Sequence, residues 1–358
     1  MKVAITAGGT GGHIFPALAI INKIKTHDKN SEFLYFGTTD RMEKDIIPER
    51  GIPYIAIPMK GLDRKNILNN ISVFKIYLNA IKKAEIELKK FKPDIVIGVG
   101  GYITAPVLVA ANRLGIKTLI HEQNSIPGVS NKLLSRFVNK ICISFKESEK
   151  YFPKKKTIYT GNPRSEEILL MEKGKREDFG FNYKSNFIIL VMGSLGSLTM
   201  TKKMKELIPA FKDKNYQVLV VTGKNYYDDY KEVKTPANVK IVPFYDAKYM
   251  KDANLLITRS GASTIAEVTA LLLPSIMIPS PYVTHNHQYK NAKALEDKKA
   301  CKILEEKDFD KKNLLPLIDD LFKKEVYNEM RKNLKEFSCP NSGEAIYKEI
   351  VKLVRNEE

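Results

Sequence analysis

Two glycine-rich turns near opposite ends of the sequence could hold a negatively charged ligand. The first is GGTGGH at residues 8–13, and the second is RSGASTIAE at residues 259–267. Each follows a short apolar run and precedes a helical pattern, so each is expected to be a strand, a tight turn and a helix start. The first N–H groups of a helix lack intrahelical partners, and phosphate or sugar oxygens can bind there. Two such turns indicate two similar domains that share a cleft.

The first turn matches neither common nucleotide-binding motif. Ile14 occupies the third glycine position of GxGxxG, and no GK[ST] follows. His13 is expected in the first turn of the helix, where the positive end of the helix dipole favours a neutral imidazole that can accept a proton. Its role is therefore either structural or that of a general base.

Two more polar segments are expected beside the first turn. The segment GVGGYITAP at residues 98–106 offers a second set of N–H groups, which either suits a pyrophosphate or serves tight packing. The segment HEQN at residues 121–124 ends an apolar strand, and four polar side chains at that position indicate a site. Glu122 could act as a base or orient a histidine, and Asn124 could bind a sugar hydroxyl.

The second half carries a matching set of polar groups. GSLGS at residues 193–197 follows an apolar strand, and the Ser194 hydroxyl could bind phosphate together with the backbone. Glu267 is expected on the first turn of its helix, either as a dipole partner or as an acceptor for two vicinal hydroxyls such as those of ribose. His285 and His287 lack a third ligand, and the sequence has neither CxxC nor HExxH, so we expect no bound metal.

Short apolar strands alternate with helical patterns in both halves. The expected strands cover residues 3–6, 33–36, 55–58, 95–99, 118–120 and 140–144, and then 187–191, 218–222, 239–242, 255–258, 275–278 and 301–304. This alternation predicts an α/β protein with two doubly wound parallel sheets, whose ligands bind at the carboxyl ends of the strands. We expect a first domain over residues 1–161 and a second over 162–342, with a last helix (343–358) that could pack back on the first.

The composition limits the class of protein. The chain has 59 Lys and Arg against 41 Asp and Glu, a net charge of +18, and three cysteines without paired spacing. The positive charge fits a lysine-rich surface, nucleic acid, an anionic membrane face or an anionic substrate. Nucleic acid is disfavoured because no aromatic-rich basic strand or recognition helix is present. Without a signal peptide or a long uncharged apolar run, the protein is expected to be cytoplasmic or to lie on a membrane surface.

The segment 66–92 is unusual because apolar residues cover two sides of one expected helix. Phe74, Leu78, Ile81 and Leu88 share one face, and a second apolar strip and several lysines are interleaved with them. One interpretation is a helix packed on two sides. The other is a helix with one side in the core and the other on a membrane, where lysines meet anionic headgroups.

The order and spacing of these motifs, together with Gly161-Asn162-Pro163, resemble those of the bacterial MurG family over essentially the whole chain. The resemblance implies a GT-B glycosyltransferase with two Rossmann-like domains facing a cleft. It implies an inverting transfer of N-acetylglucosamine from UDP-N-acetylglucosamine to the 4-hydroxyl of N-acetylmuramic acid in lipid I (undecaprenyl-pyrophosphoryl-MurNAc-pentapeptide). The products would be UDP and lipid II, the precursor of peptidoglycan.

The same resemblance implies how the protein would work in the cell. It would need no cofactor and no bound metal. It would be a peripheral protein on the cytoplasmic face of the bacterial cell membrane. Anionic lipids, and cell-wall and division proteins, would be further partners, and nucleic acid would not.

The resemblance also implies roles for individual residues. His13 would be the base for the 4-hydroxyl, with Glu122 as the alternative. The acceptor pyrophosphate is assigned to Gly8, Gly9, Gly100, Gly101, Tyr102 and Thr104. The donor is assigned to Thr10, Gly11, Gly12, Asn124, Arg164, Ser194, Tyr245, Ala262, Ser263, Thr264, Ile265, Ala266, Glu267 and Gln288. In this set Ser194 would contact the diphosphate and Glu267 the ribose hydroxyls.

Several positions depart from the family pattern, two of them in the set assigned to the donor. Arg164 comes one position earlier after residues 161–163 than in some relatives, and Tyr245 replaces an aliphatic residue beside uracil. The alternative function is that of a related GT-B enzyme, either a diacylglycerol glycosyltransferase or an epimerase of UDP-N-acetylglucosamine. The segments 98–106 and 121–124 favour the lipid I transferase over both.

Overall fold

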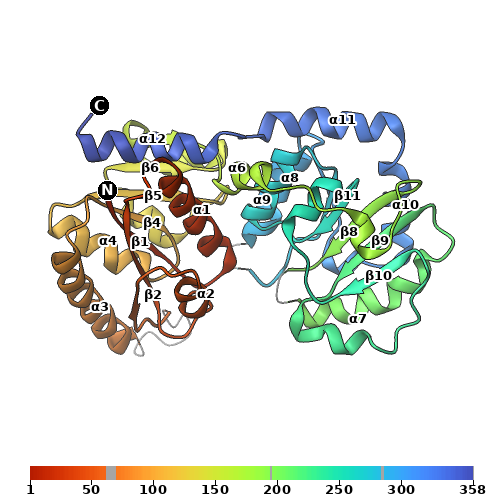
Figure 1. The fold of residues 1–358 in the computed structure, drawn as a ribbon, viewed down its shortest axis with the longest axis horizontal. Coiled ribbons are helices and arrows are strands. Elements are labelled where there is room, and N and C mark those ends of the chain that lie inside the picture. The colour runs from red at the N-terminus through yellow and green to blue at the C-terminus, as the bar shows by residue number, and fades with distance from the viewer. Residues whose placement is uncertain (62–69, 194–195, 284–285, 358) are drawn as a thin grey trace. The chain divides into compact units, whose positions relative to one another are not determined.

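The structure, a computed structural model, describes residues 1–61, 70–193, 196–283 and 286–357. The chain divides into two compact units (Figure 1). The first unit consists of Met1–Arg164 and Asn341–Glu358, and the second of Ser165–Pro340. The division falls slightly beyond the boundary expected at residue 161, so Arg164 belongs to the first unit.

The first unit is built on a parallel sheet of seven described strands, in the order β3-β2-β1-β4-β5-β6-β7. The strands are β1 (Lys2–Ala7), β2 (Glu32–Thr38), β3 (Tyr54–Ile57), β4 (Ile95–Gly100), β5 (Lys117–Glu122), β6 (Lys140–Ile143) and β7 (Thr157–Tyr159). Six of them lie where the sequence predicted strands. Strand β7 was not predicted, because it has only three residues and follows a lysine-rich segment.

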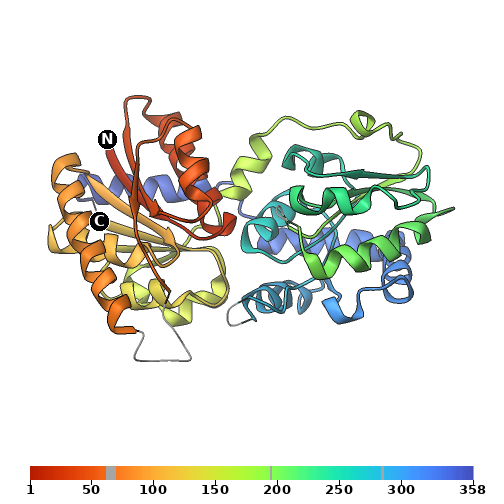
Figure 2. The same ribbon diagram turned by 90° about the horizontal axis from the view of Figure 1, so that it is seen from below.

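Helices cover both faces of this sheet, because successive side chains of a strand point to opposite faces. On one face, residues such as Ile5 pack with α1 (Gly11–His27), α2 (Glu43–Glu49) and α12 (Ser342–Arg355). On the other face, residues such as Val96 pack with α3 (Asn70–Phe91), α4 (Thr104–Arg113) and α5 (Val129–Leu134). Figure 2 shows α1, in red, and α3, in orange, on opposite sides of the sheet.

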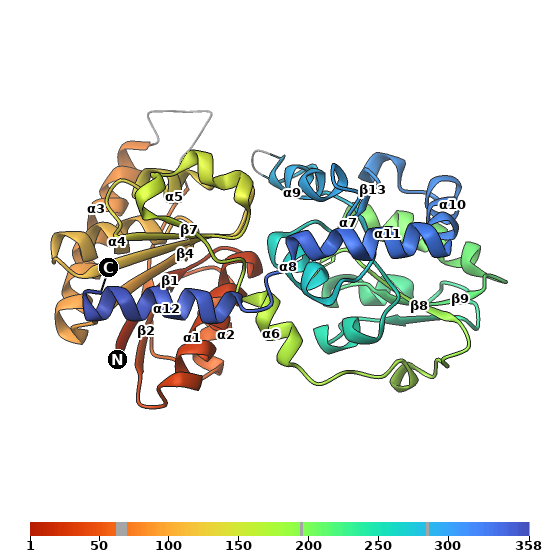
Figure 3. The same ribbon diagram turned by 90° about the horizontal axis from the view of Figure 1, so that it is seen from above.

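The last helix completes the core of the first unit. Ile346 and Ile350 of α12 are buried in the same cluster as the apolar residues of α1. At the surface of this contact, Glu344 pairs with Lys23 at 3.0 Å. The helix begins beside the linker, where Ser342 Oγ donates to the Asn162 carbonyl oxygen at 2.6 Å. Figure 3 shows α12 running along this side of the unit.

Helix α3 buries only part of the apolar face that helical spacing had grouped together. Ala80 and Ala84 lie at the centre of the buried side, because their small side chains let the helix lie close to its neighbours. Phe74 and Leu78, which were grouped with the buried Ile81, lie beyond the edge of this stripe and are 63% and 39% exposed. The described part of α3 therefore has one side in the core and an apolar side at the surface. None of the helices in the described ranges has the length and hydropathy needed to cross a membrane.

The second unit repeats the plan with a parallel sheet of six described strands, in the order β10-β9-β8-β11-β12-β13. The strands are β8 (Asn186–Val191), β9 (Tyr216–Val221), β10 (Val239–Val242), β11 (Leu255–Thr258), β12 (Ser275–Met277) and β13 (Lys302–Ile303). The helices are α6 (Arg164–Leu170), whose first residue belongs to the first unit, α7 (Leu198–Leu207), α8 (Ala262–Leu271), α9 (His287–Glu296), α10 (Lys311–Leu321) and α11 (Lys324–Leu334). Two 3-10 segments, Lys224–Tyr230 and Ala247–Asp252, follow β9 and β10.

Both sheets reverse their strand order at the same place. In the first unit the chain leaves β1 toward one edge and returns to β4 on the other side of β1, and in the second unit β8 and β11 have the same relation. A crevice forms outside the carboxyl ends of two such strands, and open parallel sheets bind their ligands there. The glycine turns at residues 8–13 and 259–261 directly follow β1 and β11. The fold therefore places both turns at the positions expected for ligand binding.

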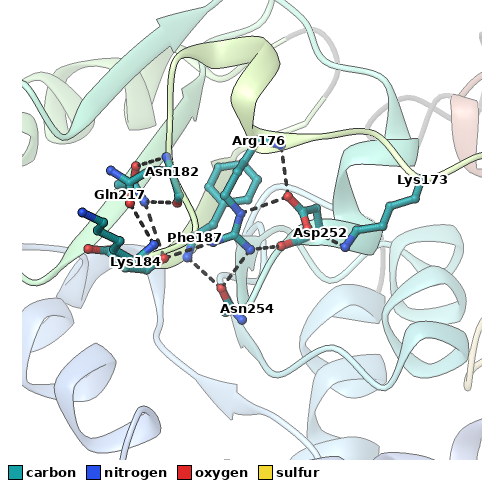
Figure 4. Close-up of polar contacts among 9 residues, drawn as sticks. Lys173, Arg176, Asn182, Lys184, Phe187, Gln217, Asp252 and Asn254 are labelled. Carbon is teal, nitrogen blue, oxygen red and sulfur yellow. Dashed lines mark hydrogen bonds and ion pairs between the residues drawn. The ribbon is translucent and has the colours of Figure 1, made fainter.

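An arginine in the second unit fixes the segment that leads into its sheet (Figure 4). The buried Arg176 donates through Nε to Asp252 Oδ2 at 2.9 Å and through Nη1 to the Ser185 carbonyl at 3.0 Å. Its guanidinium also lies 5.2 Å from the centre of the Phe187 ring. Burial raises the pKa of the Asp252 carboxyl, but the hydrogen bonds from Arg176 and Lys173 outweigh it, so the net pKa is lowered. Loss of the arginine would remove a buried ion pair and leave the half-exposed Lys173 to balance the buried Asp252 carboxylate.

We expect Arg176→Ala to lower the free energy of unfolding by about 3 kcal/mol, since it breaks a buried pair and leaves Asp252 Oδ2 without its guanidinium donor. Urea unfolding followed by circular dichroism measures this loss. Because the pKa of Asp252 is lowered in the folded state, its contribution is complete above the ordinary Asp pKa and disappears as the pH falls below it. The exposed pair of Lys90 and Glu87 provides the control, and Lys90→Ala should cost less than about 0.5 kcal/mol. Equal losses in the two variants would contradict the assignment.

Candidate functional site

The first glycine turn is bonded into the fold at its first two residues. Gly8 N–H donates to the Gly100 carbonyl oxygen at 3.1 Å, and Gly9 N–H donates to Glu43 Oε2 at 3.1 Å. A Cβ atom at Gly8 would lie 2.6 Å from Glu43 Oε1, so only glycine fits there. The N–H groups of Gly8 and Gly9 therefore already have acceptors within the protein, although the resemblance implied contact with a pyrophosphate.

The next residues begin helix α1 and leave their N–H groups directed out of the helix. Thr10 is the N-cap residue and is exposed, and its side chain makes no capping hydrogen bond. Its carbonyl oxygen accepts the N–H of His13 at 3.0 Å. Gly11 and Gly12 precede the first intrahelical donor, so their N–H groups have no acceptor within the helix. An anion or a sugar oxygen is best placed to contact these two groups.

His13 is oriented by the turn that precedes it. Its Nδ1 lies 3.0 Å from the Gly8 carbonyl oxygen. A carbonyl only accepts hydrogen bonds, so Nδ1 carries the proton and, in the neutral ring, Nε2 carries the lone pair. The ring packs against Gly100, where a Cβ atom would lie 2.5 Å from His13 Cδ2. This tautomer suits a base that acts through Nε2.

The second turn of the first unit packs against the first one. Gly100 and Gly101 have φ angles of 117° and 92°, which side chains rarely adopt, and a Cβ atom at Gly101 would meet the Gly8 backbone. Thr104 is fully buried in the first turn of α4 and donates through Oγ1 to the Gly100 carbonyl at 2.8 Å. Tyr102 is 61% exposed. Thr104 therefore shapes the turn from inside, whereas Tyr102 is accessible to a ligand.

His121 is a buried structural histidine at the end of β5. Its Nε2 donates to the Gly161 carbonyl at 3.0 Å, and its Nδ1 accepts from Gln123 Nε2 at 2.9 Å. Burial lowers the pKa of His121 to about 4. The neutral ring thus ties the carboxyl end of β5 to the linker at residues 161–163.

Glu122 has its carboxylate occupied by neighbouring donors. Oε1 accepts the N–H and the side-chain amide of Asn124 at 3.0 and 3.2 Å. Oε2 accepts Gly128 N–H at 3.0 Å and Asn131 Nδ2 at 2.9 Å. The side chain is only 2% exposed. Glu122 therefore organises the loop that carries Asn124, and Asn124 itself is half-buried.

Arg164 lies at the end of the linker in the first unit. Its guanidinium carbon is 5.8 Å from the centre of the Phe15 ring on α1, the same helix that carries His13. Its backbone N–H donates to Asn162 Oδ1 at 3.1 Å. The structure thus places Arg164 beside helix α1.

In the second unit a glycine turn also follows the first strand of the sheet. Gly193 and Gly196 have φ angles of 103° and 81°, and a Cβ atom at Gly196 would meet the Thr222 carbonyl. Ser197 is the N-cap residue of α7. Ser194, which the resemblance assigned to the diphosphate, lies outside the described residues, as does His285.

A buried ion pair lies behind this turn. Arg259, directly after β11, contacts Glu306 Oε2 at 2.6 Å and donates to the Ile278 carbonyl at 3.2 Å and to Ser197 Oγ at 3.3 Å. Thr199 Oγ1 donates to the second oxygen of Glu306 at 2.5 Å. Arg259 thereby joins the ends of β11 and β12 to the start of α7.

Helix α8 presents the other residues assigned to the donor. Gly261 is its N-cap residue in an extended conformation, which leaves the first N–H groups of the helix without intrahelical acceptors. These N–H groups belong to the first residues of a set that the resemblance assigned to the donor, namely Ala262, Ser263, Thr264, Ile265 and Ala266. Glu267 is the sixth residue of the helix, so it lies on the second turn. The sequence had indicated the first turn. Its side chain is 8% exposed.

Gln288 and Tyr245 lie on separate elements of the second unit. Gln288 is the second residue of α9 and accepts the Ser280 N–H through Oε1 at 2.8 Å, which fixes the loop after β12. Tyr245 is half-buried and follows β10. Within the described ranges, no three His, Cys, Asp or Glu side chains are grouped so that they could hold a metal ion.

Sequence reasoning missed the buried polar residues that support these turns. Glu43, Asn131 and Glu306 were not singled out, and Arg259 was given no role of its own. Glu43, Arg259 and Glu306 lie far along the chain from the turns that they support, and nothing in the local pattern distinguishes them or Asn131 from surface residues. A weak signal was available for Glu43, since charged residues in the first turn of a helix after a parallel strand lie near the binding edge of the sheet.

Comparisons with known proteins agree with this geometry. Residues 3–143 match the glycosyltransferase family 28 N-terminal domain, and residues 187–344 match the glycosyltransferase family 28 C-terminal domain. Over 97% of its length the chain is 41% identical to the UDP-N-acetylglucosamine–N-acetylmuramyl-(pentapeptide) pyrophosphoryl-undecaprenol N-acetylglucosamine transferase of Bacillus pumilus, and it covers 98% of that protein. It is 40% identical to one such transferase of Bacillus cereus, with 99% and 100% of the two chains covered.

Solved structures show the same relationship. The crystal structure of MurG from Acinetobacter baumannii aligns with a TM-score of 0.79 at 29% identity, over 98% of this chain and 99% of that one. The UDP-GlcNAc 2-epimerase of Neisseria meningitidis aligns with a TM-score of 0.69 over 98% and 100% of the chains, but at 17% identity it shares the fold alone. The predicted GT-B fold of two doubly wound parallel sheets is confirmed. The chain belongs to the MurG family of UDP-N-acetylglucosamine transferases, within glycosyltransferase family 28.

Proposed function

We propose that this protein transfers N-acetylglucosamine from UDP-N-acetylglucosamine to lipid I, giving lipid II and UDP in peptidoglycan synthesis. The observation that carries the proposal is the 41% identity to a transferase named for this reaction, over 97% of the chain. The two glycine turns at the carboxyl ends of β1 and β11 supply the kind of N–H groups that such substrates require.

His13 is proposed as the general base. As the 4-hydroxyl oxygen of the acceptor forms a bond to C1 of the sugar, the bond from C1 to the UDP oxygen breaks, and His13 Nε2 takes the hydroxyl proton. The hydrogen bond from Nδ1 to the Gly8 carbonyl supports this assignment because it leaves the lone pair on Nε2. A positioned base of this kind contributes about 10²–10⁴-fold to the rate.

Glu122 is proposed as a positioning residue. Its two oxygens accept four hydrogen bonds from Asn124, Gly128 and Asn131, so accepting a substrate proton would break part of the loop. Its effect would instead be to hold Asn124 against the donor sugar.

The acceptor pyrophosphate is proposed to meet the first unit at its two glycine turns. The accessible Tyr102 and the turn at Gly100 and Gly101, which Thr104 supports, provide one side. Gly8 and Gly9 contribute shape to the other side, because their N–H groups are already bonded within the protein.

The donor is proposed to bind mainly to the second unit. The start of α8 would hold the diphosphate and uracil, and Glu267 the ribose hydroxyls. The carboxylate of Glu267 is buried enough for its hydrogen bonds to a diol to be strong. The remaining proposed donor contacts are those of Thr10, Gly11, Gly12, Asn124, Arg164, Ser194, Tyr245 and Gln288. We propose that no cofactor or metal takes part.

We propose that the protein acts as a peripheral protein on the cytoplasmic face of the cell membrane. Exposed apolar side chains support this. Phe74 and Leu78 project from α3, Val129 and Leu133 from α5, and Phe137 follows α5. Both helices pack on α4 and cover the same face of the sheet. Exposed lysines such as Lys75 and Lys82 on α3 would meet anionic headgroups. Cell-wall and division proteins are proposed as further partners.

Release of UDP should require a lipid I analogue, and His13→Ala should lower kcat by about 10²–10⁴-fold. Glu122→Gln should keep more activity, because an amide still accepts through one oxygen. A coupled assay of UDP release measures both variants.

No turnover with a competent analogue would refute the function. Turnover of the donor without any acceptor would favour the epimerase, and turnover with diacylglycerol would favour the lipid glycosyltransferase. If Glu122→Gln abolished the rate while His13→Ala kept it, the two roles would have to be exchanged.

Glu267→Ala should weaken UDP binding by about tenfold to a hundredfold, the cost of losing hydrogen bonds to a charged acceptor. Isothermal titration calorimetry with UDP alone measures this, independently of the acceptor. Glu329→Ala, at an exposed position on α11, is the control and should bind UDP as the wild type does. Unchanged affinity in Glu267→Ala would remove the proposed ribose contact.

Replacing both Phe74 and Leu78 with serine should lower binding to vesicles that contain anionic lipid, since it removes two exposed apolar side chains from the proposed contact. Sedimentation with vesicles of phosphatidylglycerol and phosphatidylcholine is the measurement, and added salt should weaken binding further. Leu170→Ser removes a leucine of the second unit that is more exposed than either of these residues, and it should have no effect. Binding indifferent to the double substitution and to salt would contradict the proposed surface.

A further inference from the structure

A carboxylate lies buried beneath the first glycine turn. Glu43, the first residue of α2, is fully buried. Its Oε2 accepts Gly9 N–H at 3.1 Å, and its Oε1 accepts the N–H and the hydroxyl of Thr38 at 3.1 and 2.7 Å. No described Lys, Arg or His pairs with it. Burying a carboxylate without a cation is costly, and hydrogen bonds from fixed donors are what make it tolerable.

Residues at the carboxyl ends of the neighbouring strands enclose the Glu43 side chain. Tyr54 Oη donates to the Thr38 carbonyl at 2.6 Å, and Tyr35 Oη donates to the Ala7 carbonyl at 3.0 Å. Burial, and next to it the charge of Glu43, raises the pKa of both tyrosines, so both remain hydroxyl donors. A Cβ atom at Gly37 would lie 2.8 Å from Glu43 Cγ. The carboxylate therefore has a single position available to it.

This position connects Glu43 to His13 through two residues. The carboxylate takes the N–H of Gly9 and packs against Gly8, so the peptide group between these residues has a fixed orientation. The carbonyl oxygen of Gly8 accepts Nδ1–H of His13 at 3.0 Å. If the turn rotates, the acceptor that selects the imidazole tautomer moves with it. The N–H groups of Gly11 and Gly12, three and four positions from Gly8, would move as well.

We propose that Glu43 is a positioning residue for the transfer reaction, which holds the Gly8–Gly9 turn in the shape that orients His13. The inference rests on the proposed role of His13 as the base. Glu43 touches no substrate, since it is closed off beneath the turn, and it acts only through the backbone of Gly8 and Gly9.

Glu43→Gln tests this with little change of shape. The amide of glutamine presents one oxygen and one NH2 group, so it cannot accept hydrogen bonds at both former oxygen positions. The NH2 group would therefore face a donor, either on Gly9 or on Thr38. We expect kcat to fall about tenfold to a hundredfold, as small misplacements of a reacting group do, while the dissociation constant for UDP stays within about twofold. Glu43→Asp should recover part of the loss, because it keeps the charge.

A double variant separates a positioning role from a general loss of structure. If Glu43 acts through His13, the variant with both Glu43→Gln and His13→Ala should be no slower than His13→Ala alone. Losses that multiply, or an unchanged kcat in Glu43→Gln, would overturn the proposal. Glu349→Gln is the matched control, since it changes a buried carboxylate of α12 in the same unit, away from the turn. It should keep kcat, and a loss as large as that of Glu43→Gln would assign the effect to stability.

A measurement that needs no turnover can test the role of Glu43 separately from the proposed transfer reaction. Nitrogen-15 NMR of the histidine side chains, with His13 assigned through His13→Ala, reports which ring nitrogen is protonated. Glu43→Gln should change the Nδ1 and Nε2 shifts of His13 and leave those of His121 unchanged. Unchanged His13 shifts would overturn the proposal even in an active enzyme. Absence of transfer by the wild type would instead refute the proposed function.

Discussion

Backbone N–H groups that are to meet a ligand must stay without internal acceptors, yet the turn that carries them must keep one shape. Glycine makes such turns possible but does not hold them. In both units, buried polar side chains form hydrogen bonds to a turn from the side that faces the core, and these bonds hold its shape. Glu43 does so at the turn of residues 8–13, and Arg259, which is paired with Glu306, does so at the turn of residues 193–197 through Ser197. The first N–H groups of α1 and α7 can then remain without intrahelical partners because neighbouring groups are satisfied.

The two units solve this problem with opposite charges. In the first unit the supporting groups at the carboxyl ends of the strands are the carboxylates of Glu43 and Glu122, whose hydrogen bonds from described residues all come from neutral donors. In the second unit the group closest to the turn is the guanidinium of Arg259, whose charge Glu306 balances. A cation beneath a turn raises the local potential for an anion, and a carboxylate lowers it. This difference agrees with the proposal that the second unit carries most of the UDP contacts.

The sequence was sufficient for the fold and for the location of the turns, because apolar strands and glycine turns are local patterns. It was insufficient wherever a residue depends on a partner far along the chain. Glu43 and Glu306 could not be distinguished from surface carboxylates, since burial is decided by packing. Helical spacing grouped Phe74 and Leu78 with the buried Ile81, because spacing alone cannot show that the buried stripe is centred on Ala80 and Ala84. Glu267 was placed one turn too early, since the helix begins at Ala262.

The contribution of α12 to the first unit has a consequence for biosynthesis. Ile346 and Ile350 fill part of a core whose other buried members lie between Val3 and Cys142, far earlier in the chain. Until those isoleucines leave the ribosome, the face of α1 that they cover has no partner, so the first unit cannot finish folding before the second has been made. A nascent chain of this kind exposes apolar surface for most of its synthesis, which makes it a natural client for chaperones. It also means that a premature stop codon near the end of the gene would damage the beginning of the protein.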